Sequence, residues 1–222
     1  TVEDCALVFA AMHGADPRDP ATLTAPFRFE RKPDLSSLRI GYDSRANEAF
    51  VEKLRELGAK PKEIGRRPGS RRGRGGRERG GRERNGVMSI ITVESATAFD
   101  DFLAQNLDKE MVVKNRVRGW REARKVSAVD YLNAQRQRWQ LMQEMAKFMA
   151  DWDLYVSARG DLRLTNMTGH PTVVLPYIFD DQRHQPRCIM LVGNLFADDQ
   201  LLSVAAAYQQ ATDWHQRRPK LG

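Results

Sequence analysis

Cysteine is scarce in this sequence: Cys5 and Cys188 are the only two, and each lies among apolar residues. This usage is typical of a reducing compartment, so we expect two buried thiols in a cytoplasmic protein, with a disulfide or a reactive nucleophile as the alternatives. Long hydrophobic runs are missing too. No stretch approaches the ~20 apolar residues of a membrane span, and no charged-then-apolar leader opens the chain, so the sequence predicts no membrane association.

Clustered metal ligands and nucleotide-binding motifs are also missing. The histidines lie in separate segments, without Cys or carboxylate at ligand spacing: His13, His170, His184 and His215. No G-x-S-x-G, P-loop or dinucleotide fingerprint occurs. The sequence therefore predicts no metal and no cofactor, and its residues alone name no reaction.

Positive charge is concentrated in one tract, 66–86, which reads RRPGSRRGRGGRERGGRERNG. It holds nine of the 36 Lys and Arg residues against two of the 29 Asp and Glu residues, which accounts for the whole net charge of +7. The rest of the chain is balanced, so a basic footprint for polyanions is predicted only within this tract.

Helical periodicity and short β-rich runs alternate along the chain. The expected helices cover 2–13, 47–59, 127–152 and 201–215, and an apolar segment leads into another helix over 87–106. The expected strands cover 38–43, 60–64, 153–156, 172–177 and 188–193. This alternation predicts an α/β protein with a largely parallel or mixed sheet, in which the strand near 60–64 lies parallel to 38–43.

The helix over 127–152 carries an apolar stripe of Met and aromatic residues. Such a stripe indicates core packing and not a cofactor site. Its members are Tyr131, Leu132, Trp139, Met142, Met145, Phe148 and Met149.

The segment 164–176, LTNMTGHPTVVLP, places polar residues directly before a buried strand. We interpret Thr165, Asn166, Thr168 and Gly169 as a polar turn. Because ligand crevices of open α/β sheets lie at the carboxyl ends of strands, a turn that precedes its strand is expected to cap that strand.

Three separated segments, in order, resemble the C-terminal half of the amidase signature family: TVEDCALVFAAMHGADPRDP, LTNMTGHPTVVLP and LVGNLFADDQLLSVAAAYQQATDWHQRRP. Members include fatty acid amide hydrolases, bacterial amidases and the A subunit of glutamyl-tRNA amidotransferases. The resemblance implies a large mixed sheet covered on both faces by helices, and residues 1–222 as a partial amidase domain interrupted at 65–86. The chain opens on Thr1 within a helix, so we expect it to be part of a longer protein.

The family hydrolyses amides with a lysine and two serines, one of them in a cis peptide, through an acyl-enzyme. The resemblance puts that triad upstream of this chain, so no catalytic residue is carried over and the isolated chain is expected to be inactive. The implied partners are a small-molecule amide substrate and the missing N-terminal half of the domain. Asn166, Thr168 and Gly169 match the family's TN-x-TG-x-P turn and are candidates for the pocket wall, and 139–148 is expected to help shape the substrate-facing region.

Three interpretations of the tract 66–86 stay open. Arg and Gly codons are rich in G and C, so a misread frame in a GC-rich gene would produce such a string where the family has a strand and an apolar connection. A disordered insertion fits the composition equally. The third interpretation makes the chain a non-catalytic nucleic-acid-binding protein, although the tract has no Phe or Tyr to stack on bases.

Overall fold

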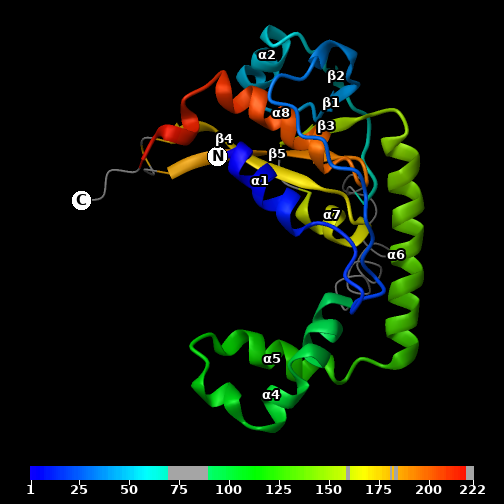
Figure 1. Ribbon diagram of the computed structural model, residues 1–222. Coiled ribbons are helices and arrows are strands. Elements are labelled where there is room, and N and C mark those ends of the chain that lie inside the picture. Colours follow the sequence, from blue (N-terminus) through cyan, green and yellow to red (C-terminus); the bar gives the residue numbers. More distant parts are fainter. Residues whose placement is uncertain (70–89, 159–160, 181, 183–184, 219–222) are drawn as a thin grey trace. The chain divides into compact units, whose positions relative to one another are not determined.

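Figure 1 shows the computed structural model of the chain, which describes residues 1–69, 90–158, 161–180, 182 and 185–218. The chain divides into two compact units. The first comprises Thr1–Pro68 with Met145–Gly222, and the second comprises Gly69–Glu144. The sheet lies in the first unit, whereas the described part of the second is helical.

The sheet has five strands in the order β2-β1-β3-β5-β4. Their bounds are Ile40–Tyr42 for β1, Lys62–Glu63 for β2, Leu154–Ser157 for β3, Thr172–Asp180 for β4 and Gln185–Gly193 for β5. β1 is parallel to β2 and to β3, and β5 is antiparallel to β3 and to β4. The predicted mixed α/β sheet is confirmed, including the parallel pairing of the strand after Lys60 with the strand before Asp43.

Helix α2, Glu48–Glu56, makes the crossover from β1 to β2. The Asn47 side chain accepts a hydrogen bond from the Phe50 N–H and so caps the first turn. Phe50 and Leu54 share one face of the helix and are both fully buried. This amphipathic pattern lays α2 against the sheet, which lets a short β2 pair with β1.

Helices cover both faces of the sheet, as predicted. On one face α1, Val2–Met12, and α8, Asp198–Gln210, enclose the main apolar core together with the inward residues of β1, β3 and β5. On the other face Phe148, near the end of α6 (Ala128–Met149), packs edge-on against Tyr155 of β3, with ring centroids 5.5 Å apart. Side chains alternate along β3, so that Leu154 and Val156 enter the first core while Tyr155 faces the other layer.

The two cysteines are exposed, so the prediction of two buried thiols is wrong. Cys188 lies in the part of β5 that extends past the end of β3, because pairing with β3 stops at Met190. The residues of β5 before Ile189 are therefore exposed, whereas those from Ile189 onward are buried. Cys5 lies on the outer face of α1.

The second unit has a small core of its own, built around Trp120. Its elements are a helical stretch at 90–98, α4 (Asp100–Ala104), the 3₁₀ turn η2 (Leu107–Glu110) and α5 (Lys114–Ala123). The Trp120 ring stacks on Phe99 at 4.4 Å between centroids, and its Nε1 donates to Ser95 Oγ at 2.7 Å. The expected helix over 87–106 is thus present as two pieces, and residues 87–89 lie outside the described part.

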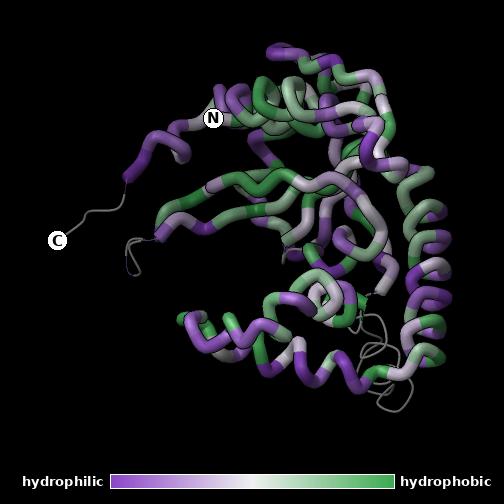
Figure 2. Tube along the Cα trace, turned by 60° about the horizontal axis from the view of Figure 1, so that its bottom comes forward, coloured by the Kyte–Doolittle hydropathy of each residue, from purple (hydrophilic) through white to green (hydrophobic). Residues whose placement is uncertain are grey.

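The apolar stripe of α6 is buried only in part. Met145 and Met149 are buried, but Leu132 and Trp139 are 57% and 62% exposed, so their assignment to the core is wrong. At 100° per residue these two positions lie roughly 120–140° around the helix from Met145. The sequence stripe was therefore too wide for one helical face, and Figure 2 shows the resulting mixed hydropathy along this helix.

Within the described residues, no helix combines the length and apolar character that crossing a membrane requires. Residues 70–86 of the Arg/Gly tract lie outside the described part, and only its first four residues belong to it.

Candidate functional site

A cluster of charged side chains lies where the parallel strands β1 and β3 end. Asp43 directly follows β1, Ser157 is the last residue of β3, and Asp161 is the N-cap of α7 (Leu162–Thr168). The carboxyl ends of parallel strands form the ligand-binding edge in open α/β sheets. This cluster is therefore the candidate site that the fold itself singles out.

Arg67 is at the centre of this site. Its Nη2 donates to Asp43 Oδ2 at 2.6 Å, and its Nη1 donates to Ser157 Oγ at 2.9 Å and to Asp161 Oδ2. The side chains of Arg67, Asp43 and Asp161 are 9%, 7% and 16% exposed. The composition of the tract that begins at residue 66 is typical of disorder, yet Arg67 is buried, because two carboxylates compensate the burial of its charge.

Tyr155 of β3 borders the site on the side of the sheet. Its hydroxyl donates to Asp161 Oδ2 at 2.9 Å, and the Arg67 guanidinium lies 5.9 Å from the centre of its ring. Burial, and next the neighbouring Asp161 charge, raise the pKa of Tyr155 far above its usual value. The phenol therefore stays protonated and acts as a hydrogen-bond donor.

Asp43 remains ionised in spite of its burial. Burial alone raises the pKa of its carboxyl, but hydrogen bonds from the backbone and side chain of Arg45 and the charge of Arg67 outweigh that effect and lower the pKa. Asp43, Asp161, Arg45 and Arg67 together are neutral in net charge. Because both carboxylates already accept hydrogen bonds from arginine, the arrangement suits recognition of a cation better than general-base chemistry.

The residues predicted for the pocket wall lie at the far end of α7. The structure has a helix at 162–168 where the sequence indicated a polar turn, and this helix leads into β4. Its seven residues span about 10 Å, so Asn166, Thr168 and Gly169 are not brought into the cluster around Asp161. The helix forms because its apolar residues Leu164 and Met167 are buried three positions apart.

The three predicted residues differ in their surroundings. Asn166 is exposed, whereas Thr168 is buried and donates from Oγ1 to the Leu164 carbonyl at 3.0 Å. Because that bond uses the hydroxyl proton, His170 Nδ1, 2.9 Å from the same oxygen, carries a proton and donates to it. Gly169 ends the helix with φ +83°, a left-handed conformation that glycine adopts without strain.

Sequence reasoning missed Asp43, Arg67 and Asp161. A signal for Asp43 was present, since it follows the apolar run LRIGY at the point where a strand ends. The sequence contains no comparable signal for Arg67, because Arg67 is one of nine arginines in a tract whose composition indicates disorder.

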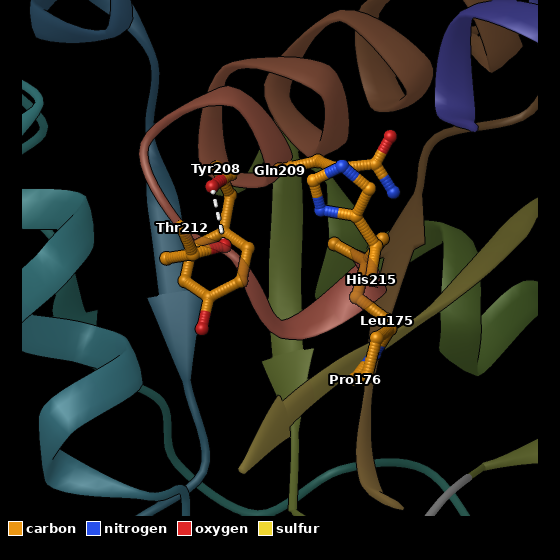
Figure 3. A pocket seen from close by; sticks show the side chains of 6 residues that line it. All are labelled: Leu175, Pro176, Tyr208, Gln209, Thr212 and His215. Carbon is orange, nitrogen blue, oxygen red and sulfur yellow. Dashed lines mark hydrogen bonds between the residues drawn. The ribbon is translucent and has the colours of Figure 1, made fainter. Parts of the chain in front are cut away.

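A shallow hollow lies elsewhere in the first unit, between the end of α8, the 3₁₀ turn η3 (Trp214–Gln216) and β4. Figure 3 shows the His215 ring beside Gln209, with Leu175 and Pro176 of β4 beneath, and Thr212 Oγ1 donating to the Tyr208 carbonyl at 3.1 Å. The hollow has no room for a water-sized molecule. The hollow is therefore a small surface irregularity in the packing and not a ligand site.

No protein-family model matches the chain. Over 269 aligned residues the chain is 28% identical to the A subunit of the glutamyl-tRNA(Gln) amidotransferase of Synechococcus elongatus, an alignment that covers 100% of this chain and 55% of that protein. The fold matches a bacterial aryl acylamidase of the amidase signature family with a TM-score of 0.77 and 17% identity, over 97% of this chain and 52% of the other. It also matches the peptide amidase of Stenotrophomonas maltophilia, with a TM-score of 0.71 and 20% identity, over 100% of this chain and 53% of the other.

The chain spans about half the length of the curated relatives it matches. The similarity in sequence runs along the whole chain, and the similarity in fold includes the mixed sheet and its helices. The resemblance stated from the sequence is therefore confirmed: the chain is similar in sequence to the A subunit of glutamyl-tRNA(Gln) amidotransferases and has the fold of amidase signature enzymes, over about half of their length.

Proposed function

We propose that this chain is one part of an amide hydrolase of the amidase signature type, and that the lysine and two serines that cleave the amide lie upstream of it. The observation that carries this proposal is the match of the entire chain to about half of the A subunit of the glutamyl-tRNA(Gln) amidotransferase. The proposed reaction is hydrolysis of a carboxamide C–N bond through an acyl-enzyme. The chain by itself is then inactive, and its partners are the rest of the domain and a small-molecule amide.

In this proposal the chain supplies sheet, covering helices and part of the pocket wall. Asn166 is exposed on α7 and is free to contact a substrate, while Thr168 and Gly169 fix the end of that helix through a buried hydrogen bond and a left-handed cap. The family match of these three residues supports a role at the pocket. We assign substrate contact to Asn166 and a positioning role to the other two.

The test is an assay of two proteins, the 222-residue chain and a longer product that includes the upstream coding sequence. The isolated chain should show no turnover of simple carboxamides, and the longer protein should hydrolyse at least one. In the longer protein Asn166→Ala should raise KM with a smaller effect on kcat, whereas Asn133→Ala, an exposed asparagine of α6, should change neither.

Turnover by the rigorously purified 222-residue chain would contradict the proposal. So would an upstream reading frame that encodes no lysine and no Gly/Ser-rich double-serine segment.

A further inference from the structure

We propose that Asp43, Asp161 and Ser157 form a binding site for a guanidinium group, which Arg67 of the same chain occupies. This inference is independent of the amide hydrolase proposal, because it concerns a cation and not the amide bond. The ligand class is an arginine side chain or a small guanidinium compound.

The three acceptors are held by separate regular elements. Asp43 follows β1, Ser157 ends β3, and Asp161 precedes α7, so the sheet and the helix fix their positions. Arg67 belongs instead to the coil after β2. The site is therefore built by the fold, whereas its occupant is supplied by a connecting segment.

The geometry fits a guanidinium better than an ammonium group. The acceptors lie on two sides of the cation, so that Nη2 reaches Asp43 while Nη1 reaches both Ser157 and Asp161. A planar fork satisfies such divergent acceptors together, and a compact ammonium does not. The Tyr155 ring, 5.9 Å from the guanidinium carbon, adds an aromatic face next to the cation.

The charges around the site also favour a cation. Without the Arg67 side chain, two carboxylates with little access to water would face each other across the vacated space, and Tyr155 would remain a neutral donor to Asp161. Arg45 would compensate only part of this charge, because its side chain is 53% exposed and its bonds to Asp43, at 3.3 Å to Oδ1 and 3.5 Å to Oδ2, are longer than the 2.6 Å bond from Arg67. A free guanidinium would restore both the lost charge and the lost hydrogen bonds.

The test is rescue of Arg67→Ala by methylguanidinium chloride, measured on the full 222-residue chain. We expect the Tm of the variant to fall and then to rise with methylguanidinium in a saturable way in the millimolar range, with one ion bound per chain by calorimetric titration. Methylammonium chloride and sodium chloride at equal ionic strength should not reproduce the rise. The wild-type chain should not respond, because its site is filled.

Two further variants serve as controls. Arg39→Ala removes an arginine from a more exposed pair with Asp153, and methylguanidinium should give it no saturable stabilisation. The double variant Arg67→Ala/Asp161→Asn lacks one carboxylate of the site and should lose the rescue. If Arg67→Ala does not fold alone, refolding with methylguanidinium should recover more folded protein than refolding with methylammonium.

A folded Arg67→Ala chain without saturable methylguanidinium binding would overturn the proposal. An equal response to methylammonium, an undiminished rescue in the double variant, or equal refolding yields with the two cations would overturn it as well.

Discussion

Arg67 and Asp43 form an ion pair that is almost completely removed from water, with Nη2 and Oδ2 2.6 Å apart and neither side chain more than 9% exposed. Buried pairs of this kind contribute little net stability compared with apolar residues, but the loss of one partner leaves the other charge uncompensated. The pair also ties the coil after β2 to the end of β1. The first residues of the Arg/Gly tract are thus part of the folded unit.

Asp43→Ala should therefore lower the free energy of unfolding by about 3 kcal/mol, because it leaves the Arg67 charge buried with one carboxylate fewer. Asp16→Ala is the control: it breaks an exposed carboxylate–arginine pair with Arg18 and should cost much less, because water screens that pair. Urea denaturation of the full chain measures both values. Equal losses in the two variants would show that the buried pair has no special role.

His170 should make stability depend on pH in mildly acidic solution. Burial lowers its pKa in the folded chain, so below the unfolded value of about 6.5 the unfolded chain binds the proton more readily. The contribution of His170 to the free energy of unfolding is present above that pH. It is lost as the pH falls toward the lowered pKa of the folded chain.

Between about pH 7 and 5 the wild-type free energy of unfolding should fall more steeply than that of His170→Asn, in which the amide can still donate to Thr168. The limit for one group is about 1.4 kcal/mol per pH unit. Parallel urea titrations at several pH values measure the two slopes. Identical slopes would contradict the lowered pKa of His170 in the folded chain.

Gly41 of β1 is required by its neighbours. A Cβ at this position would lie 2.3 Å from Ile64 Cγ2 and 3.2 Å from the Trp152 ring. Gly41→Ala should thus cost about 1–3 kcal/mol through overpacking. Gly65→Ala, where a Cβ meets no atom within 4 Å, should change the free energy of unfolding by less than about 1 kcal/mol. An unchanged free energy of unfolding in Gly41→Ala would mean that Ile64 and Trp152 move away from β1 without cost.

The isolated chain should self-associate. Leu7, Val8 and Met12 of α1 are 58–78% exposed, and β4 is an edge strand of the described sheet. We expect oligomers or aggregates in light scattering at micromolar concentration, and fewer of them in Leu7→Lys/Met12→Lys. A monodisperse wild-type monomer with a sharp cooperative melt would contradict this expectation.

Much of the fold follows from local patterns. The helix predicted over 2–13 is present, and Thr1 and Asp4 form a capping box at its start. The apolar run at 38–43 followed by an amphipathic helix predicts β1, α2 and a parallel β2. Such signals succeed because capping and periodicity act within a few residues.

The features that the sequence does not predict depend on burial and on contacts between residues far apart in the chain. The helix 162–168 looked like a turn because Thr and Asn are weak helix formers, and burial of Leu164 and Met167 overrides that weakness. The charged site needs residues separated by 94 positions, and no spacing rule brings Arg67 to Asp161. Only the strand order of the sheet shows that these residues lie together.

The last prediction separates Arg67 from the later arginines of the Arg/Gly tract. Arg67 is held by Asp43 and Asp161 and is not available to phosphates, whereas the arginines of 70–86 lie outside the described residues. Replacing all arginines of 70–86 by serine should leave the free energy of unfolding nearly unchanged. The same change should remove whatever weak, salt-sensitive binding to single-stranded RNA the chain has, because that binding rests on charge alone.

Arg67→Ala should do the reverse, destabilising the chain while leaving RNA binding intact, because the buried guanidinium stabilises the fold and does not reach a phosphate. RNA titrations at two salt concentrations, with urea denaturation of the same variants, measure both effects. Tight RNA binding that the serine substitutions abolish would support a nucleic-acid arm. A marked loss of stability on those substitutions would instead show that the later part of the tract belongs to the folded core.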